Sequence, residues 1–143
     1  AASHAVLRRL AAAFEAAGRL DAERPVLVGL PAGSRHEIGA LAFATAARRR
    51  GIGVVYLGAD VTHDSWIDAA HVTNARGVVI GIPSAGDRGP GRQVAETMVH
   101  SGGWLVAAGG AGALDADLPA EVLQLPNGIV SSTAALQQAL ADR

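Results

Sequence analysis

From Pro25 onward, short apolar runs alternate with segments whose apolar residues recur at helical spacing. Strands followed in turn by helical crossovers build a parallel sheet that is covered by helices on both faces. The pattern therefore predicts an α/β domain with a five-stranded parallel sheet. Its expected strands are 26–30, 54–57, 78–82, 104–108 and 122–125, and its expected helices are 36–50, 63–74, 92–101 and 132–141.

The segment before this pattern has a different character. Residues 2–18 carry apolar side chains at helical spacing, with Ser3 available as a cap and Gly18 as a stop. One amphipathic helix is therefore expected ahead of the sheet. We accordingly divide the chain into a helix with its linker at 1–24 and an α/β domain at 25–143.

Composition narrows the classes of function. The chain has 143 residues, half of them apolar, which suffices for one domain and one core. It lacks an apolar run long enough to span a membrane and lacks a signal-peptide pattern, so we expect a piece of a longer cytoplasmic protein. A net charge of -1 argues against a broad phosphate-binding surface. Because cysteine is absent, thiolate catalysis and cysteine-ligated metals are excluded, and histidine is the remaining good nitrogen ligand.

Glycine recurs at the carboxyl ends of four expected strands. Gly29 stands one residue before the end of the first strand, while Gly58, Gly81 and the pair Gly109-Gly110 stand at the ends of the others. Ligands of open α/β sheets bind along this edge, and glycine leaves volume there. The pattern favours a large ligand at the edge, although each glycine taken alone is equally typical of a turn.

The stretch from Pro31 to Gly39 carries the most informative polar residue. His36 is expected near the start of the first sheet helix, where the helix dipole disfavours protonation and keeps the imidazole available to a metal. Gly39, one turn further on, would let a large group approach. The alternative is that His36 caps the helix and contacts no ligand.

Three motifs resemble a known family: Gly33-Ser-Arg-His-Glu-Ile-Gly-Ala40, Arg48-Arg-Arg-Gly51 and Val55-Tyr-Leu-Gly-Ala-Asp60. They are similar to the cobalamin-binding domain of MerR-type light-dependent repressors, the CarH and LitR group, and the resemblance extends from Pro25 to the C-terminus. It implies a flavodoxin-like (Rossmann-like) fold that binds adenosylcobalamin or another cobalamin. In this superfamily a histidine replaces dimethylbenzimidazole as lower axial ligand of cobalt, and the displaced nucleotide tail enters the sheet.

Carried over by position, His36 is the expected cobalt ligand. The family has an acidic residue two positions earlier, where this chain has Ser34, so we expect weaker or water-mediated coordination, with the serine able to accept a hydrogen bond. The family's Ser-x-Leu segment reads Gly81-Ile82-Pro83, followed by Ser84. The expected cofactor-binding residues are Ser34, Arg35, His36, Glu37, Gly39, Asp60, Gly81, Ser84, Gly109, Gly110 and Ser131, the last opening the final helix as a cap or as a contact to the nucleotide end.

The resemblance implies the sensory domain of a light-responsive transcriptional regulator. It also implies a homo-oligomer, DNA binding through a separate winged helix outside this chain, and no membrane partner. The first helix would be the last helix of a truncated helical cap, so binding without full switching is expected. No catalytic set is apparent, because Ser34, His36 and Asp60 lack the arrangement of a hydrolytic triad, and we expect no enzyme. Two alternatives stay open: a corrinoid carrier of a methyltransferase or mutase, and a degenerate module that has lost the cofactor.

Overall fold

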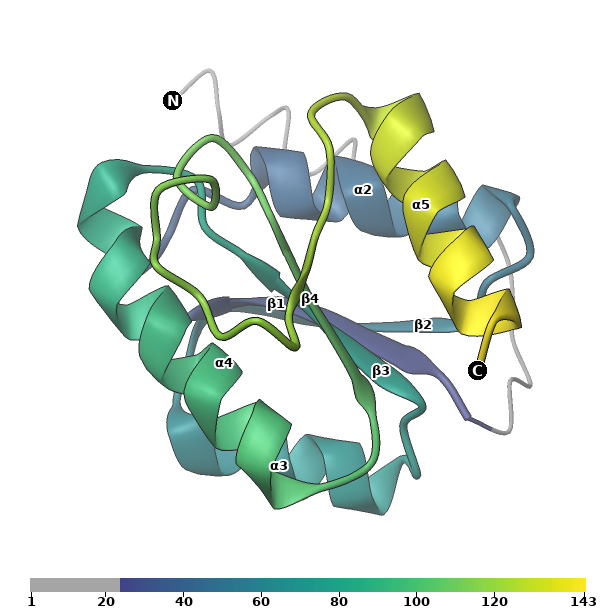
Figure 1. Ribbon diagram of the computed structural model, residues 1–143, viewed down its shortest axis with the longest axis horizontal. Helices are drawn as coiled ribbons and strands as arrows, with labels where there is room; N and C mark the ends of the chain where they lie inside the picture. Colours follow the sequence, from purple (N-terminus) through teal and green to yellow (C-terminus); the bar gives the residue numbers. More distant parts are fainter. Residues whose placement is uncertain (1–23) are drawn as a thin grey trace.

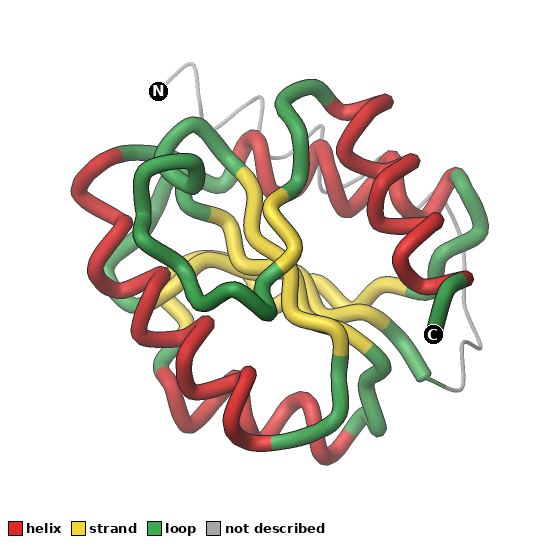
Figure 2. Tube along the Cα trace, in the orientation of Figure 1, coloured by secondary structure: helices red, strands yellow, loops and turns green. Residues whose placement is uncertain are grey.

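The computed structural model describes residues 24–143, and the helix expected at 2–18 lies outside them. The described chain alternates strands and helices around one sheet (Figures 1 and 2). The sheet has the order β2-β1-β3-β4-β5 with every pair parallel, which confirms the predicted five-stranded sheet and is the order of flavodoxin-like folds. The elements are β1 (Val26–Pro31), α2 (Ile38–Arg49), β2 (Val54–Val61), α3 (His63–Val72), β3 (Gly77–Gly81), a 3-10 turn (Ala85–Asp87), α4 (Arg88–Ser101), β4 (Leu105–Gly109), β5 (Leu123–Gln124) and α5 (Ile129–Ala141).

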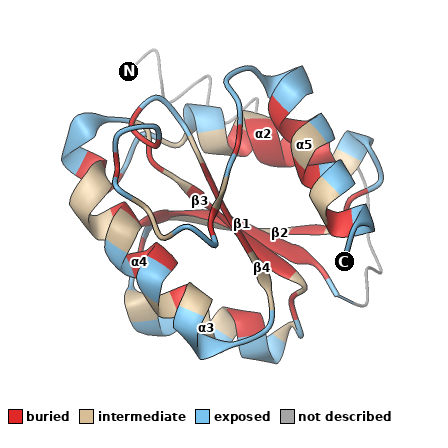
Figure 3. Ribbon diagram, viewed as in Figure 1, coloured by how far each residue is buried: buried red, intermediate tan, exposed pale blue. Residues whose placement is uncertain are grey.

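Helices α2 and α5 cover one face of the sheet, and α3 and α4 cover the other (Figure 1). Successive strand residues point to opposite faces, so the sheet supports two cores. On one side Leu27 belongs to a buried cluster with Trp66 of α3. On the other side Val28 belongs to a cluster with Phe43 of α2 and Leu136 of α5. All six residues of β1 are buried, which explains why this strand reads as a continuous apolar run (Figure 3).

Helix α4 begins at Arg88, four residues before its predicted start at position 92. The Gly-Pro-Gly sequence at 89–91 reads as a helix breaker, but it falls in the first turn. The first N–H groups of a helix have no partner within the helix, so Pro90 removes no hydrogen bond there. Gly91 faces Ile82, because a Cβ on Gly91 would lie 2.7 Å from the Ile82 side chain. The start of α4 thus packs closely against the end of β3.

Two other boundaries differ from the prediction by three or more residues. Strand β2 continues to Val61, so Gly58 lies within the strand and the predicted strand end at position 57 is wrong. The register between β1 and β2 shifts where Gly29 pairs with Gly58, and Gly58 has φ +88°. Such an irregularity bends a strand, and the positive φ suits glycine. Helix α5 begins at Ile129 rather than at Ser132, after Gly128.

Candidate functional site

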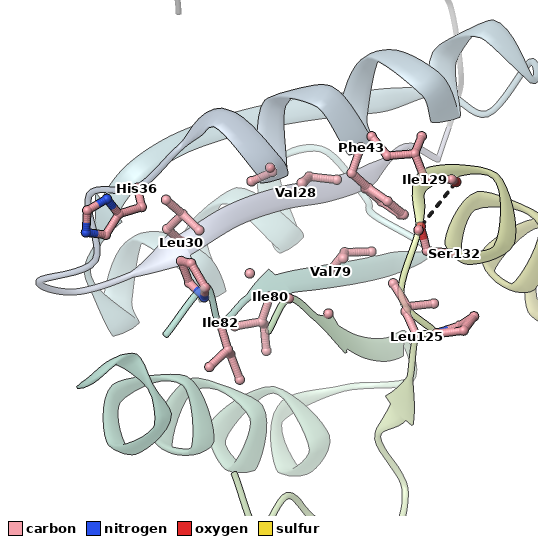
Figure 4. Close-up of a pocket in the computed structure, with 18 residues that line it drawn as sticks. Val28, Leu30, His36, Phe43, Val79, Ile80, Ile82, Leu125, Ile129 and Ser132 are labelled. Atoms are coloured by element: carbon pink, nitrogen blue, oxygen red, sulfur yellow. Dashed lines mark hydrogen bonds between the residues drawn. The ribbon is translucent and has the colours of Figure 1, made fainter. Parts of the chain in front are cut away.

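A cavity of about 200 Å³ opens at the carboxyl ends of β1, β3 and β4, between the sheet and helices α2 and α5 (Figure 4). The chain leaves β1 toward β2 on one side and leaves β3 toward β4 on the other, and a crevice forms where the strand order reverses. We call this space the His36 cavity. Its lining residues are Val28, Leu30, His36, Gly39, Ala40, Phe43, Val79, Ile80, Gly81, Ile82, Pro83, Gly109, Gly110, Leu125, Pro126, Gly128, Ile129 and Ser132.

Most of the lining is apolar. Val28 and Val79 form the sheet side of the cavity, Phe43 comes from α2, and Leu125 follows β5 (Figure 4). A cavity of about 150 Å³ with similar walls is large enough for benzene. The interior of the His36 cavity therefore suits an apolar, planar group the size of an aromatic ring system.

His36 lies at the mouth of the cavity, two residues before α2 begins, and its side chain is exposed (Figure 4). The N-cap of α2 is Glu37, which makes no side-chain capping bond. The alternative that His36 caps the helix is therefore wrong. Its ring makes no hydrogen bond to any residue between 24 and 143, so a nitrogen is available to an incoming ligand.

The loop that carries His36 is held by Asp60 at the end of β2. The Asp60 carboxylate accepts a hydrogen bond from the Gly33 N–H at 2.7 Å and pairs with the Arg35 guanidinium at 3.3 Å. The Asp60 N–H also donates to the Ser34 carbonyl at 2.9 Å. Asp60 has φ +56°, a conformation that aspartate tolerates better than most residues. Asp60 and Arg35 thus position the loop beside the cavity, and a contact of either with a ligand stays a prediction.

Ser34 stands two positions before His36 and is almost completely buried, at 1% exposure. Its hydroxyl has no hydrogen-bond partner in the described part of the chain. The expectation that this serine could accept a bond from the imidazole is therefore wrong for this structure. His36 lacks an orienting partner on this side.

Glu37 turns toward β2 and does not line the cavity. Its carboxylate accepts a hydrogen bond from the Tyr56 hydroxyl at 2.9 Å, and Gly58 leaves room for it, because a Cβ there would lie 3.8 Å from Glu37 Oε1. Burial raises the pKa of Tyr56, and the hydrogen bond and negative charge of Glu37 raise it further. The hydroxyl thus remains a donor. Sequence reasoning missed this pair, because only the β1–β2 pairing brings Tyr56 to the His36 loop.

The predicted glycines Gly39, Gly81, Gly109 and Gly110 all line the cavity, but they do so for different reasons. A Cβ at Gly39 would meet no atom within 4 Å, so this glycine leaves open volume at the mouth. A Cβ at Gly109 would make an ordinary contact of 3.5 Å with Leu125. Among these four glycines, open space for a ligand therefore comes from Gly39, and Gly128, which also lines the cavity, has the same open surroundings.

The other two glycines are required by the packing of the protein itself. A Cβ at Gly81 would lie 2.5 Å from the Leu30 side chain. A Cβ at Gly110 would lie 2.5 Å from the Ile82 carbonyl oxygen, and Gly110 has φ +112°. Gly81 thus leaves room for the Leu30 side chain of β1, and Gly110 allows the loop after β4 to lie against the end of β3.

Neither predicted serine of the second half of the chain lines the cavity. The Ser84 hydroxyl donates to Asp87 at 2.7 Å and so stabilises the turn before α4. Ser131 is exposed within the first turn of α5, and the N-cap is Gly128, so the prediction that Ser131 opens or caps the helix is wrong. Ser132 lines the cavity instead, and its hydroxyl donates to the Ile129 carbonyl at 3.2 Å (Figure 4). An earlier helix start, signalled by Gly128, would have identified it.

Within residues 24–143 no three histidine or acidic side chains gather as a metal site, and no helix is long and apolar enough to cross a membrane.

No family model and no curated protein matches the chain. Solved structures do match, and two of them are described here. A cobalamin-binding protein from Desulfitobacterium hafniense DCB-2 is 19% identical with a TM-score of 0.66, over 80% of this chain and 58% of that one. The monomethylamine corrinoid protein of Methanosarcina barkeri is 15% identical with a TM-score of 0.67, over 88% of this chain and 63% of that one. The chain has their fold. It spans about three fifths of each protein's length, and at these identities the similarity establishes the flavodoxin-like fold alone.

Proposed function

We propose that this domain binds a cobalamin through the His36 cavity. The observation that carries the proposal is an exposed imidazole at the mouth of an apolar cavity, at the point where the strand order of a flavodoxin-like sheet reverses. This imidazole has no hydrogen-bond partner among residues 24–143. Two proteins of the same fold are described as cobalamin-binding and corrinoid proteins, which supports the proposal.

The residues present fit such a cofactor. A corrin brings cobalt with four equatorial nitrogen ligands, so one imidazole is enough for the protein to add, and His36 would supply it. The apolar walls suit the dimethylbenzimidazole base of the nucleotide tail, and the open space at Gly39 allows the corrin to approach. Because the imidazole has no carboxylate partner, we expect its bond to cobalt to be weaker than in proteins that have one.

The cofactor we propose is adenosylcobalamin, whose cobalt–carbon bond is cleaved by light. The domain would then be the sensory part of a cytoplasmic, light-responsive MerR-type regulator and not an enzyme. The similarity of the segments 33–40, 48–51 and 55–60 to that family supports this. In the complete protein, a separate winged helix would bind DNA and the chain would form a homo-oligomer. A light response requires two protein states with different affinities for intact and cleaved cofactor.

Titration of the purified domain with hydroxocobalamin and adenosylcobalamin, followed by visible spectroscopy, tests cofactor binding. We expect saturable binding and a red-shifted spectrum typical of histidine ligation. His36→Ala should abolish the shift, while His100→Ala should retain it, because His100 hydrogen-bonds the Glu96 carbonyl near the end of α4. No binding of either corrinoid would overturn the proposal and favour a degenerate module.

The regulatory role has a separate test in the full-length protein. DNA binding and oligomeric state are measured with adenosylcobalamin in darkness and after illumination. We expect assembly and DNA binding in darkness and loss of both after light. A protein that binds the corrinoid but shows no such difference would refute the photoreceptor role and leave cobalamin binding intact.

A further inference from the structure

A second cavity lies at the opposite edge of the sheet, where the strands begin. It encloses about 490 Å³ and is lined by Arg24, Arg76, Gly103, Leu140 and Arg143. Because all strands are parallel, residues that precede different strands meet at this edge: Arg24 precedes β1, Arg76 precedes β3 and Gly103 precedes β4. The end of α5 completes the wall with Leu140, and Arg143 follows it. We call this space the arginine groove.

Three guanidinium groups share the groove, and among residues 24–143 none that lines it carries a side-chain carboxylate. Like charges in one concave space repel one another, and the low-dielectric walls strengthen the field. A net charge of -1 for the whole chain gives no sign that three arginines share one space. The groove is therefore a local positive site on a nearly neutral protein.

Helix ends explain part of this arrangement. Helices α3, α4 and α5 run opposite to the strands, so their C-terminal carbonyls face this edge and attract cations. Arg24 donates to the Asn74 carbonyl at 3.4 Å, just beyond α3, and Arg143 donates to the Gly103 carbonyl, just beyond α4. Each of these contacts uses one nitrogen of a guanidinium and leaves its other donors available.

Arg76 is not explained by helix ends. Its backbone is fixed, since its N–H donates to the Pro25 carbonyl and its own carbonyl accepts from the Leu105 N–H, both at 3.0 Å. Its half-buried side chain makes no hydrogen bond or ion pair with any residue of the described chain. The Arg76 guanidinium lies beside two further guanidiniums on a fixed backbone, and no described residue accepts from any of its five donors. It can therefore bind an anion from solution.

We propose that the arginine groove binds a small anion that carries more than one phosphate group, with Arg76 as its central contact. Guanidinium forks match phosphate oxygens in pairs, and three forks exceed what a single carboxylate can use. The groove is concave and local, which favours a small diphosphate or triphosphate over the extended backbone of a nucleic acid. This site is independent of the His36 cavity, from which the sheet separates it.

Inorganic pyrophosphate is the probe for the test. The purified domain is titrated by calorimetry at low ionic strength, and amide shifts are followed by NMR. We expect saturable binding, with shifts at Arg76 and Gly103 but not at Gly39. Arg76→Gln should weaken binding at least tenfold. Arg49→Gln is the matched control, because it removes the same charge at a different place. Arg49 is exposed at the end of α2 and has no partner among the described residues.

The control separates a built site from a general charge effect. Equal weakening by Arg49→Gln and Arg76→Gln would overturn the proposal, as would the absence of saturable binding at millimolar pyrophosphate. Thermal unfolding of each variant verifies folding. If Arg76→Gln does not fold, Arg24→Gln replaces it, with the same expected loss. His36→Ala should leave pyrophosphate binding unchanged, so the outcome does not depend on cobalamin.

Discussion

Substitution of Gly39 should separate the stability of the protein from its ability to bind a ligand. Gly39 is the second residue of α2, and a Cβ there would meet no atom within 4 Å. Glycine costs about 1 kcal/mol relative to alanine in a helix interior, so about half of that is expected in the first turn. Gly39→Ala should therefore stabilise the protein without ligand by about 0.5 kcal/mol, which is about 2 °C in Tm for a domain of this size.

A larger side chain at the same position should fill the mouth of the His36 cavity. Gly39→Leu retains the gain in helix propensity and adds four carbon atoms in total where the proposed corrin would approach. We expect a Tm at or above that of the wild-type protein and at least a tenfold loss of cobalamin affinity. Circular dichroism melting without cofactor and the visible titration measure the two effects independently.

Gly110→Ala is the control, because the same substitution of glycine by alanine is made where protein atoms already occupy the position of the added Cβ. A Cβ at Gly110 would lie 2.5 Å from the Ile82 carbonyl oxygen, in a backbone conformation with φ +112°. Backbone strain of this kind costs about 1 to 3 kcal/mol, so we expect a loss of about 2 kcal/mol. Wild-type affinity in Gly39→Leu would refute the assignment of the cavity as the cofactor site, and a lower Tm in Gly39→Ala would refute the open space.

Three further changes test the surroundings of the site. Ser34→Ala should raise the free energy of unfolding in urea by about 1 kcal/mol, because it removes a buried hydroxyl without a partner; a loss would mean that the hydroxyl bonds an internal water. Tyr56→Phe should lower it by about 1 kcal/mol at neutral pH, by leaving Glu37 without its donor. Folding raises the pKa of Tyr56, so the stability that its protonated hydroxyl contributes is complete below the ordinary pKa of 10.0 and is lost at higher pH. Above pH 10 the wild-type protein should therefore lose more stability than Tyr56→Phe. Parallel pH profiles of the two proteins would contradict this. Asp60→Asn, which tolerates the same φ, should weaken cobalamin binding about threefold by loosening the Gly33 loop, and unchanged affinity would show that the loop needs no carboxylate.

The sequence was sufficient for the order and type of the elements, because the strands are buried and read as apolar runs. Strand β1 was predicted to within one residue for this reason. The predicted boundaries are wrong where a tertiary contact overrides the local preference of the sequence. Pro90 and its flanking glycines suggested a loop, yet Gly91 packs on Ile82 within α4. Gly58 suggested a strand end, yet it marks the irregularity that β2 needs to follow β1.

At the candidate site the sequence identified residues but not the contacts between them. His36 could be placed at the edge of the sheet, because the loop after a parallel strand must lie there. Its surroundings depend on β2, which the strand order places beside β1 and whose irregular register brings Asp60 and Tyr56 against the loop. No spacing along the chain encodes that register shift. The arginine groove was hidden for the same reason, since Arg24 and Arg76 are far apart in sequence and the overall charge is nearly zero.

The glycines show how much a sequence pattern alone indicates about ligand binding. Glycine at the carboxyl ends of several strands was interpreted as volume for a ligand. Three of these glycines, Gly81, Gly109 and Gly110, line the cavity, together with Gly39 of α2 and Gly128. In the structure, neighbouring protein atoms occupy the space that a side chain at Gly81 or Gly110 would need. Beside Gly39 the corresponding space is empty. Only the second kind predicts that a substitution blocks a ligand without harming the fold. A ligand-binding glycine is therefore recognised by the emptiness around its missing Cβ and not by its position at a strand end.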